Sequence, residues 1–247
     1  GTPVFSFDSY YGIQEANRLP DLLNTEEYLL IRNEAINNAN SLRDPIRQLD
    51  TYDVAILDTL GEVNWLDEVF NSAPTQRYSL SASGGGDNGS FYLLGEYSSQ
   101  EGVFKRQRYD KYLLRFNGDI GTKKFRVGNN ISFSYTDRDV INSSGDGGGP
   151  GNELSGIRYA LIAAPVFPIY DQNGNYNNTS STLGDPTLYG DGNANPLAFI
   201  DATNWTVQRY RFFGNVFAEY EFLPNLTVRT NLGADILFQD ENIFKER

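Results

Sequence analysis

The chain has 247 residues, a net charge of −12, and no cysteine, histidine or methionine. These absences exclude disulfides and thiolate metal sites and remove the commonest general base, while the acidic balance argues against nucleic-acid binding. Sixteen tyrosines, 16 phenylalanines and 24 glycines instead favour an all-β protein with polar loops.

Alternating apolar and polar residues predict seven strands, because successive side chains of a strand point to opposite faces. In the clearest case Phe125, Phe133 and Tyr135 oppose Arg126 and Asn130. The predicted ranges are 4–13, 77–84, 90–98, 109–120, 124–136, 208–222 and 226–238. The last four reach the length of roughly ten residues that a tilted strand needs to cross a membrane, whereas soluble strands usually have about five or six.

The connections between these strands are expected to alternate in length. Short turns rich in Gly, Asn and Pro lie at 85–89, 121–123 and 223–225, and long connections span about 14–76, 99–108 and 137–207. In outer-membrane barrels the short turns face the periplasm and the long loops face outward.

The first long connection contains helix signals. Asn24 and Glu27 have the spacing of a capping box, so a helix should begin there. A second short helix is expected at 64–71, around Trp65.

Several short phrases carry a family resemblance through their order along the chain. They include YGIQ at 11–14, LLNTEEY at 22–28, NWLDEVF at 64–70, LSASGG at 80–85, PIYDQNGNY at 168–176 and NPLA at 195–198. This series resembles the SusC/RagA family of TonB-dependent outer-membrane transporters of Bacteroidetes. The resemblance implies an all-β fold, a segment of a large antiparallel transmembrane β-barrel of the 22-stranded class. We expect residues 1–247 to form one partial barrel domain, its N-terminal part, without the plug domain and the C-terminal strands.

The same resemblance implies TonB-dependent active import of large nutrients, oligosaccharides or peptides, across the bacterial outer membrane. The implied partners are a SusD-like surface lipoprotein, TonB through a region upstream of the barrel, outer-membrane lipid, and a glycan or peptide substrate. We expect no catalytic residue, no cofactor and no metal site.

Candidate site residues fall into two groups. On the barrel wall, the polar face should point into the lumen. Its side chains would contact either passing cargo or the plug and water. The residues on this face are Arg115, Arg126, Asn130 and Arg229, together with Asn117, Asp119, Ser132, Asn231 and Asp235. In the loops, Trp65 is either a stacking platform for sugars or an anchor of a small loop core. Tyr170, Asn173 and Tyr176 are further ligand-binding candidates. The Asp-x-Asn-Gly-Asn spacing at 171–175 echoes a calcium loop but lacks its distal glutamate.

Two alternatives stay open at this point. A soluble β-sandwich or jelly-roll carbohydrate-binding module also has alternating strands and long binding loops. A glycan-processing enzyme could use two of the plentiful acidic residues, although no pair stands out by its position.

Overall fold

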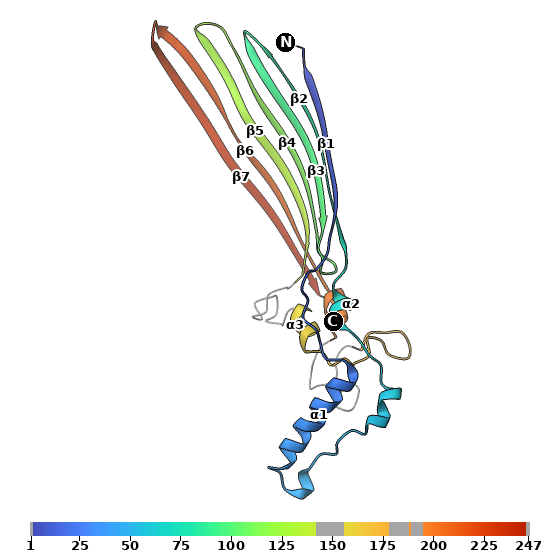
Figure 1. Cartoon of the computed structure of the whole chain (residues 1–247). Helices are drawn as coiled ribbons and strands as arrows, with labels where there is room; N and C mark the ends of the chain where they lie inside the picture. The colour runs from blue at the N-terminus through green and yellow to red at the C-terminus, as the bar shows by residue number, and fades with distance from the viewer. Residues whose placement is uncertain (1, 142–155, 178–187, 189–194, 246–247) are drawn as a thin grey trace. The chain divides into compact units, whose positions relative to one another are not determined.

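Seven antiparallel strands form one sheet in the order of the chain (Figure 1). The structure is a computed structural model that describes residues 2–141, 156–177, 188 and 195–245. The strands are β1 (Val4–Gln14), β2 (Ala73–Gly86), β3 (Gly89–Glu101), β4 (Arg108–Gly121), β5 (Phe125–Val140), β6 (Thr203–Leu223) and β7 (Leu226–Lys245). The predicted fold class, a seven-stranded segment of a large barrel wall, is confirmed. No second sheet is present among the described residues, so the alternative of a sandwich is wrong.

The short connections have the chemistry that tight turns require. In the turn between β6 and β7, Asn225 adopts φ 69°, a conformation that asparagine tolerates better than most residues. One expected long connection is wrong, because β3 and β4 stay paired until Glu101 lies opposite Arg108. That connection therefore contains only residues 102–107.

The two faces of the sheet differ in chemistry. On one face the large apolar side chains are uncovered: Phe5 is 72% exposed, Phe7 68% and Leu114 59%. The opposite face carries charged and amide side chains. An apolar face that no second layer covers must meet another apolar phase, and lipid supplies one.

A row of five tyrosines crosses the apolar face. The residues lie opposite one another on β2 to β6 and are Tyr78, Tyr97, Tyr112, Tyr135 and Tyr210. Neighbouring ring centroids from Tyr97 to Tyr210 are 4.9, 6.0 and 4.7 Å apart. The next position toward the long connections is polar, with Asp110 opposite Asp137. The row therefore marks one edge of the apolar band, where amphipathic aromatic rings belong.

The height of this band agrees with a membrane. From Tyr135 to Phe125 on β5 the chain advances ten residues, or about 34 Å along the strand. A strand tilted by about 40° would convert that length into about 26 Å, close to the apolar band of about 25 Å of outer-membrane barrels.

A second compact unit is formed by residues 16–71 and by the described residues between 141 and 203. Its helices are α1 (Thr25–Asn40), α2 (Trp65–Val69), α3 (Gly156–Ile162) and α5 (Pro196–Ala202), with the 3-10 turns η1 (Pro45–Arg47) and η2 (Val54–Thr59). The predicted capping box at α1 is confirmed, since Glu27 N–H donates to Asn24 Oδ1 at 2.9 Å and Asn24 N–H donates to Glu27 Oε2 at 3.1 Å.

The core of this unit joins segments that are about 100 residues apart in sequence. Trp65 and Val69 of α2 are fully buried with Phe167, and Val63 N–H donates to the Pro165 carbonyl at 2.8 Å. Within the described part of the chain, none of the helices has the length and apolar character needed to span a bilayer.

Candidate functional site

The polar face of the sheet carries matched ion pairs near the short turns. Arg126 on β5 donates to Asp119 on β4 through Nε at 2.8 Å and Nη2 at 2.5 Å, and Ser90 donates to the same carboxylate at 2.6 Å. On the neighbouring strands, Arg229 donates to Glu219 at 2.8 Å. Arg126 and Glu219 lie directly opposite each other, so these charges alternate in sign across β4 to β7.

An aromatic ring is packed into this charged cluster. Phe217 lies opposite Gly128, and the Arg229 guanidinium lies over the Phe217 ring at 4.2 Å from its centroid. A Cβ at Gly128 would meet two ring carbons of Phe217 at 2.5 Å. Glycine at this position therefore makes room for the ring, and the ring in turn supports the arginine.

A row of asparagines crosses the same face, two residues further from the short turns along each strand. Asn117, Asn130 and Asn215 lie opposite one another on β4, β5 and β6, and Asn215 Nδ2 donates to Asn231 Oδ1 on β7 at 2.6 Å. Among the described residues, Asn117 Oδ1 is buried without a hydrogen-bond partner. A buried amide oxygen without a partner is uncommon, because the loss of its hydrogen bond to water is not offset.

The structure brings the four wall candidates together on one face. Arg115 lies opposite Ser132, one step beyond the asparagine row. Arg126 and Arg229 form the ion pairs described above, and Asn130 lies in the asparagine row. Asn215 is a contact that the sequence reading missed, although the alternation of Asn215, Phe217 and Glu219 along β6 could have revealed it.

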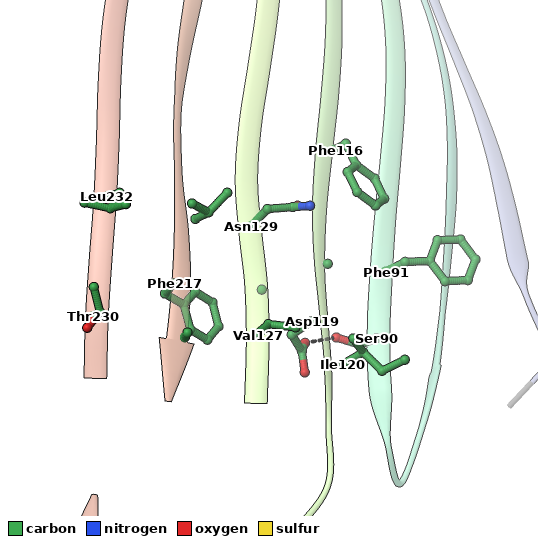
Figure 2. A pocket seen from close by; sticks show the side chains of 14 residues that line it. Ser90, Phe91, Phe116, Asp119, Ile120, Val127, Asn129, Phe217, Thr230 and Leu232 are labelled. Atoms are coloured by element: carbon green, nitrogen blue, oxygen red, sulfur yellow. Dashed lines mark hydrogen bonds between the residues drawn. The ribbon is translucent and has the colours of Figure 1, made fainter. Parts of the chain in front are cut away.

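A shallow hollow of about 520 Å³ also occurs in the wall, and Figure 2 shows its lining. Most of its side chains, such as Phe91, Phe116 and Leu232, belong to the apolar face, and Gly118 leaves the gap between them. Asn129 is also on this face, and among the described residues its Oδ1 is buried without a partner. The apolar lining assigns this hollow to the lipid side of the wall.

Trp65 is fully buried in the second unit. Its indole N–H donates to the Ala164 carbonyl at 3.0 Å, and its ring lies 5.7 Å from that of Phe167. A ring buried in this way cannot stack on a sugar, so the geometry favours its role as an anchor of the loop core.

The segment around Tyr170 and Tyr176 forms a tight turn. The two residues are bridged, and their rings stack with centroids 5.0 Å apart. Asp171 Oδ1 accepts from the backbone N–H groups of Asn173 and Asn175 at 2.8 and 2.9 Å, while Gly174 adopts φ 84°. These contacts present the half-exposed Tyr170 and the exposed Asn173 on the loop surface.

Two ionisable groups of this turn have shifted pKa values. The backbone N–H of Asn175, followed by that of Asn173, holds the pKa of the Asp171 carboxyl below its usual range. The hydrogen bond from the Tyr176 hydroxyl to Asp201, 2.5 Å long, raises the pKa of Tyr176. Asp171 is thus used as a turn cap. Over the described ranges there is no group of three acidic, His or Cys side chains that could hold a metal ion.

Curated relatives are similar over most of the chain. TonB-dependent receptor P3 of Formosa agariphila is 27% identical over 241 residues, which is 97% of this chain and 21% of the relative. TonB-dependent receptor SusC of Bacteroides thetaiotaomicron is 24% identical over 193 residues, 71% of this chain and 18% of the relative. The resemblance to the SusC/RagA family is confirmed. No family model matches the chain.

Solved structures of this family share the fold. The RagAB peptide importer in the closed-closed state superposes with a TM-score of 0.72 at 21% identity, covering 98% of this chain and 29% of that chain. Another structure, of the RagAB peptide transporter, gives a TM-score of 0.70 at 21% identity and the same two coverages. The sheet is thus a segment of a large barrel wall, and the predicted outer-membrane location is confirmed. The chain spans about a fifth of the length of the SusC-like receptors it matches.

Proposed function

We propose that this chain is the N-terminal part of the barrel wall of a transporter that imports large nutrients, oligosaccharides or peptides, across the bacterial outer membrane. The observation that carries the proposal is the sheet itself. One face is apolar, uncovered and edged by a tyrosine row, and the other holds charges and amides in cross-strand networks. A wall with lipid on one side and a polar lumen on the other requires this division.

We propose that transport depends on TonB and on a SusD-like surface lipoprotein. The similar proteins are called TonB-dependent receptors, and the structural relative is a peptide importer, which supports energised uptake of a macromolecular nutrient. The chain performs no covalent chemistry in this proposal, in keeping with relatives that are called receptors and an importer.

The wall and loop candidates take different roles. Arg115, Arg126, Asn130 and Arg229 face the lumen, where they bind a plug or contact cargo. The turn with Tyr170, Asn173 and Tyr176 offers an aromatic and amide surface to the ligand or the lipoprotein, because stacked rings supply rigid apolar area and the exposed Asn173 amide supplies hydrogen-bonding groups.

The proposal is tested with the full-length gene in its bacterium. We expect the protein in the outer-membrane fraction, and we expect its deletion to abolish growth on one class of oligosaccharide or peptide while growth on monomers continues. Deletion of TonB should cause the same defect. Recovery of the full-length protein in the soluble periplasm, or unchanged uptake of every polymer after deletion, would refute the proposal.

A second experiment examines the loop turn. Tyr170→Ala should reduce uptake or co-purification of the lipoprotein, while Tyr170→Phe, which keeps the stacked ring, should retain both. Equal behaviour of the two variants would remove the turn from the proposed surface.

A further inference from the structure

A groove on the polar face gathers positive charge at the end of the strands from which the long connection 141–202 departs. Its volume is about 330 Å³, and its lining includes Lys111, Thr136, Arg138, Arg209 and Arg211. Lys111 on β4 and Arg209 on β6 lie directly opposite Thr136 on β5. Arg138 lies two residues beyond Thr136 on the same face. Three strands therefore direct cations into one groove.

The charge in this groove is not balanced as it is near the short turns. Arg211 is paired with Asp235 by two hydrogen bonds of 2.9 and 2.6 Å, but Arg209 donates only to the neutral Gln239, at 2.6 Å. Within the described residues, Lys111 and Arg138 have no hydrogen bond or ion pair.

Two further acidic residues of the described chain lie nearby, Glu241 on β7 and Glu96 on β3. Glu241 accepts from Trp205 Nε1 at 2.8 Å and from Gln239 Nε2 at 3.4 Å. Glu96 lies opposite Leu113, which is two residues after Lys111 on β4. It makes no ion pair in the described part of the chain.

Even if Glu96 and Glu241 are each counted against one of the three cations Lys111, Arg138 and Arg209, one unmatched cation remains, and no described residue that lines the groove is acidic. In a chain with a net charge of −12, such a local cluster of cations creates a positive potential that attracts an anionic partner.

We propose that this groove binds the anionic groups of an acidic oligosaccharide, one that carries carboxylate or sulfate. Guanidinium groups present planar pairs of donors that fit carboxylate and sulfate oxygens, and cations on β4 and β6 stand about 10 Å apart, so they can hold separate anionic groups of one chain. The inference rests on the proposed transport function, because it assigns the groove to the path of the cargo.

The donor and acceptor balance favours a saccharide over a peptide. The groove offers many donors but few free acceptors, since Asp235 is engaged by Arg211 and Gln239 by Arg209. A peptide backbone brings an N–H donor for nearly every carbonyl and would leave those donors unpaired. An acidic saccharide is rich in acceptors, its hydroxyls can pair with Ser134 and Thr136, and Tyr109 adds an apolar ring surface at the edge.

The test measures binding to the purified full-length transporter in detergent by isothermal titration calorimetry. The probes are a tetrasaccharide of uronic acids, a sulfated tetrasaccharide, a neutral tetrasaccharide and penta-glutamate. We expect one of the two acidic saccharides to bind at least about tenfold more tightly than the neutral one, and added salt to weaken this binding. The preferred acidic saccharide distinguishes carboxylate from sulfate.

Variants then locate the site. Arg138→Gln and Arg209→Gln should each weaken binding of the acidic saccharide roughly tenfold, and the triple variant with Lys111→Gln by about a hundredfold or more. Arg209→Lys, which keeps the charge, should lose less than Arg209→Gln. The matched control is Arg108→Gln on the opposite face of β4, where the guanidinium pairs with Asp110 and Asp139 at 3.3 and 3.5 Å, and it should leave affinity unchanged.

Resistance of the folded barrel to denaturation by sodium dodecyl sulfate at room temperature confirms that each variant is folded. The inference is overturned if the neutral saccharide or penta-glutamate binds as tightly as the acidic saccharides. It is also overturned if the groove variants lower only thermal stability, because an acidic segment of the same protein then fills the groove. If the neutral saccharide or the peptide is imported and the groove variants leave that import intact, the proposed function stands and this inference fails. If no oligosaccharide or peptide is imported at all, the proposed function itself fails.

Discussion

Gly128 offers a sharp test of the packing on the polar face. A methyl group added there would meet two ring carbons of Phe217 at 2.5 Å and the Gly118 carbonyl oxygen at 2.8 Å. The ring can move only by giving up its contact with the Arg229 guanidinium, 4.2 Å from its centroid. We therefore expect Gly128→Ala to lower the free energy of unfolding by about 1–3 kcal/mol, the usual cost of overpacking.

Gly95 supplies the matched control in the interior of β3, two strands away from Gly128 on β5. A Cβ there meets only Leu114 Cδ2, at 3.7 Å, which is an ordinary contact. Because glycine within a strand is less stable than alanine by about 0.5–1 kcal/mol, Gly95→Ala should stabilise the protein slightly. The two variants should then differ by about 1.5–4 kcal/mol, with opposite signs relative to the wild type.

The assay is urea unfolding of the full-length protein in phospholipid vesicles, with the midpoint and slope fitted together. Combining Gly128→Ala with Phe217→Ala should recover part of the lost free energy of unfolding. Two of the three close contacts of the added methyl group then disappear, and the one with the Gly118 carbonyl stays. The reasoning is refuted if Gly128→Ala and Gly95→Ala have the same effect, or if the two substitutions at 128 and 217 are additive.

Three further predictions concern polar groups. Asn129→Leu should raise the free energy of unfolding by about 1 kcal/mol in the same urea assay, because it removes an unpaired amide from the lipid side of the wall, and a loss of stability would contradict this. Asn195 is fully buried, its Oδ1 accepting from Leu197 N–H and its Nδ2 donating to the Ile169 carbonyl, so Asn195→Ala should speed hydrogen exchange of α5 while the sheet keeps its protection. The carboxylate of Asp171 has a lowered pKa in the folded turn, so its stabilising effect is complete above the ordinary pKa of about 3.9 and is lost as pH falls through the lower folded-state value. A fluorotyrosine placed at position 170 should report this loss by NMR in acid, and Asp171→Asn should remove the pH dependence.

Local features of the fold could be predicted because their physical signals are local. The alternation in 124–136 assigned Phe125 and Phe133 to one face, and Asn24 with Glu27 predicted the start of α1. The ends of the strands were harder to predict from the sequence. The extension of β6 back to Thr203 and of β3 to Glu101 depends on backbone pairing with neighbouring strands, which no single segment reveals.

The candidate site also combines features that the sequence predicts with features that depend on the tertiary structure. The polar-face candidates Arg126, Asn130 and Arg229 were visible from alternation. The structure pairs Arg126 with Asp119 and Arg229 with Glu219, and it places Asn130 opposite Asn117 and Asn215. Asn129 was passed over in that reading, although the period of two assigns it to the apolar face.

The sequence alone determined that this chain makes seven strands with one apolar and one polar face, because a strand alternates its side chains every residue and needs no distant partner to do so. The tertiary structure decided which side chains meet. Asn117, Asn130 and Asn215 form a row, and Lys111, Arg138 and Arg209 share a groove, only because register sets residues of separate strands side by side. The pairing register is a non-local property, fixed by hydrogen bonds between strands up to about 100 residues apart, and the charge of the groove follows from it.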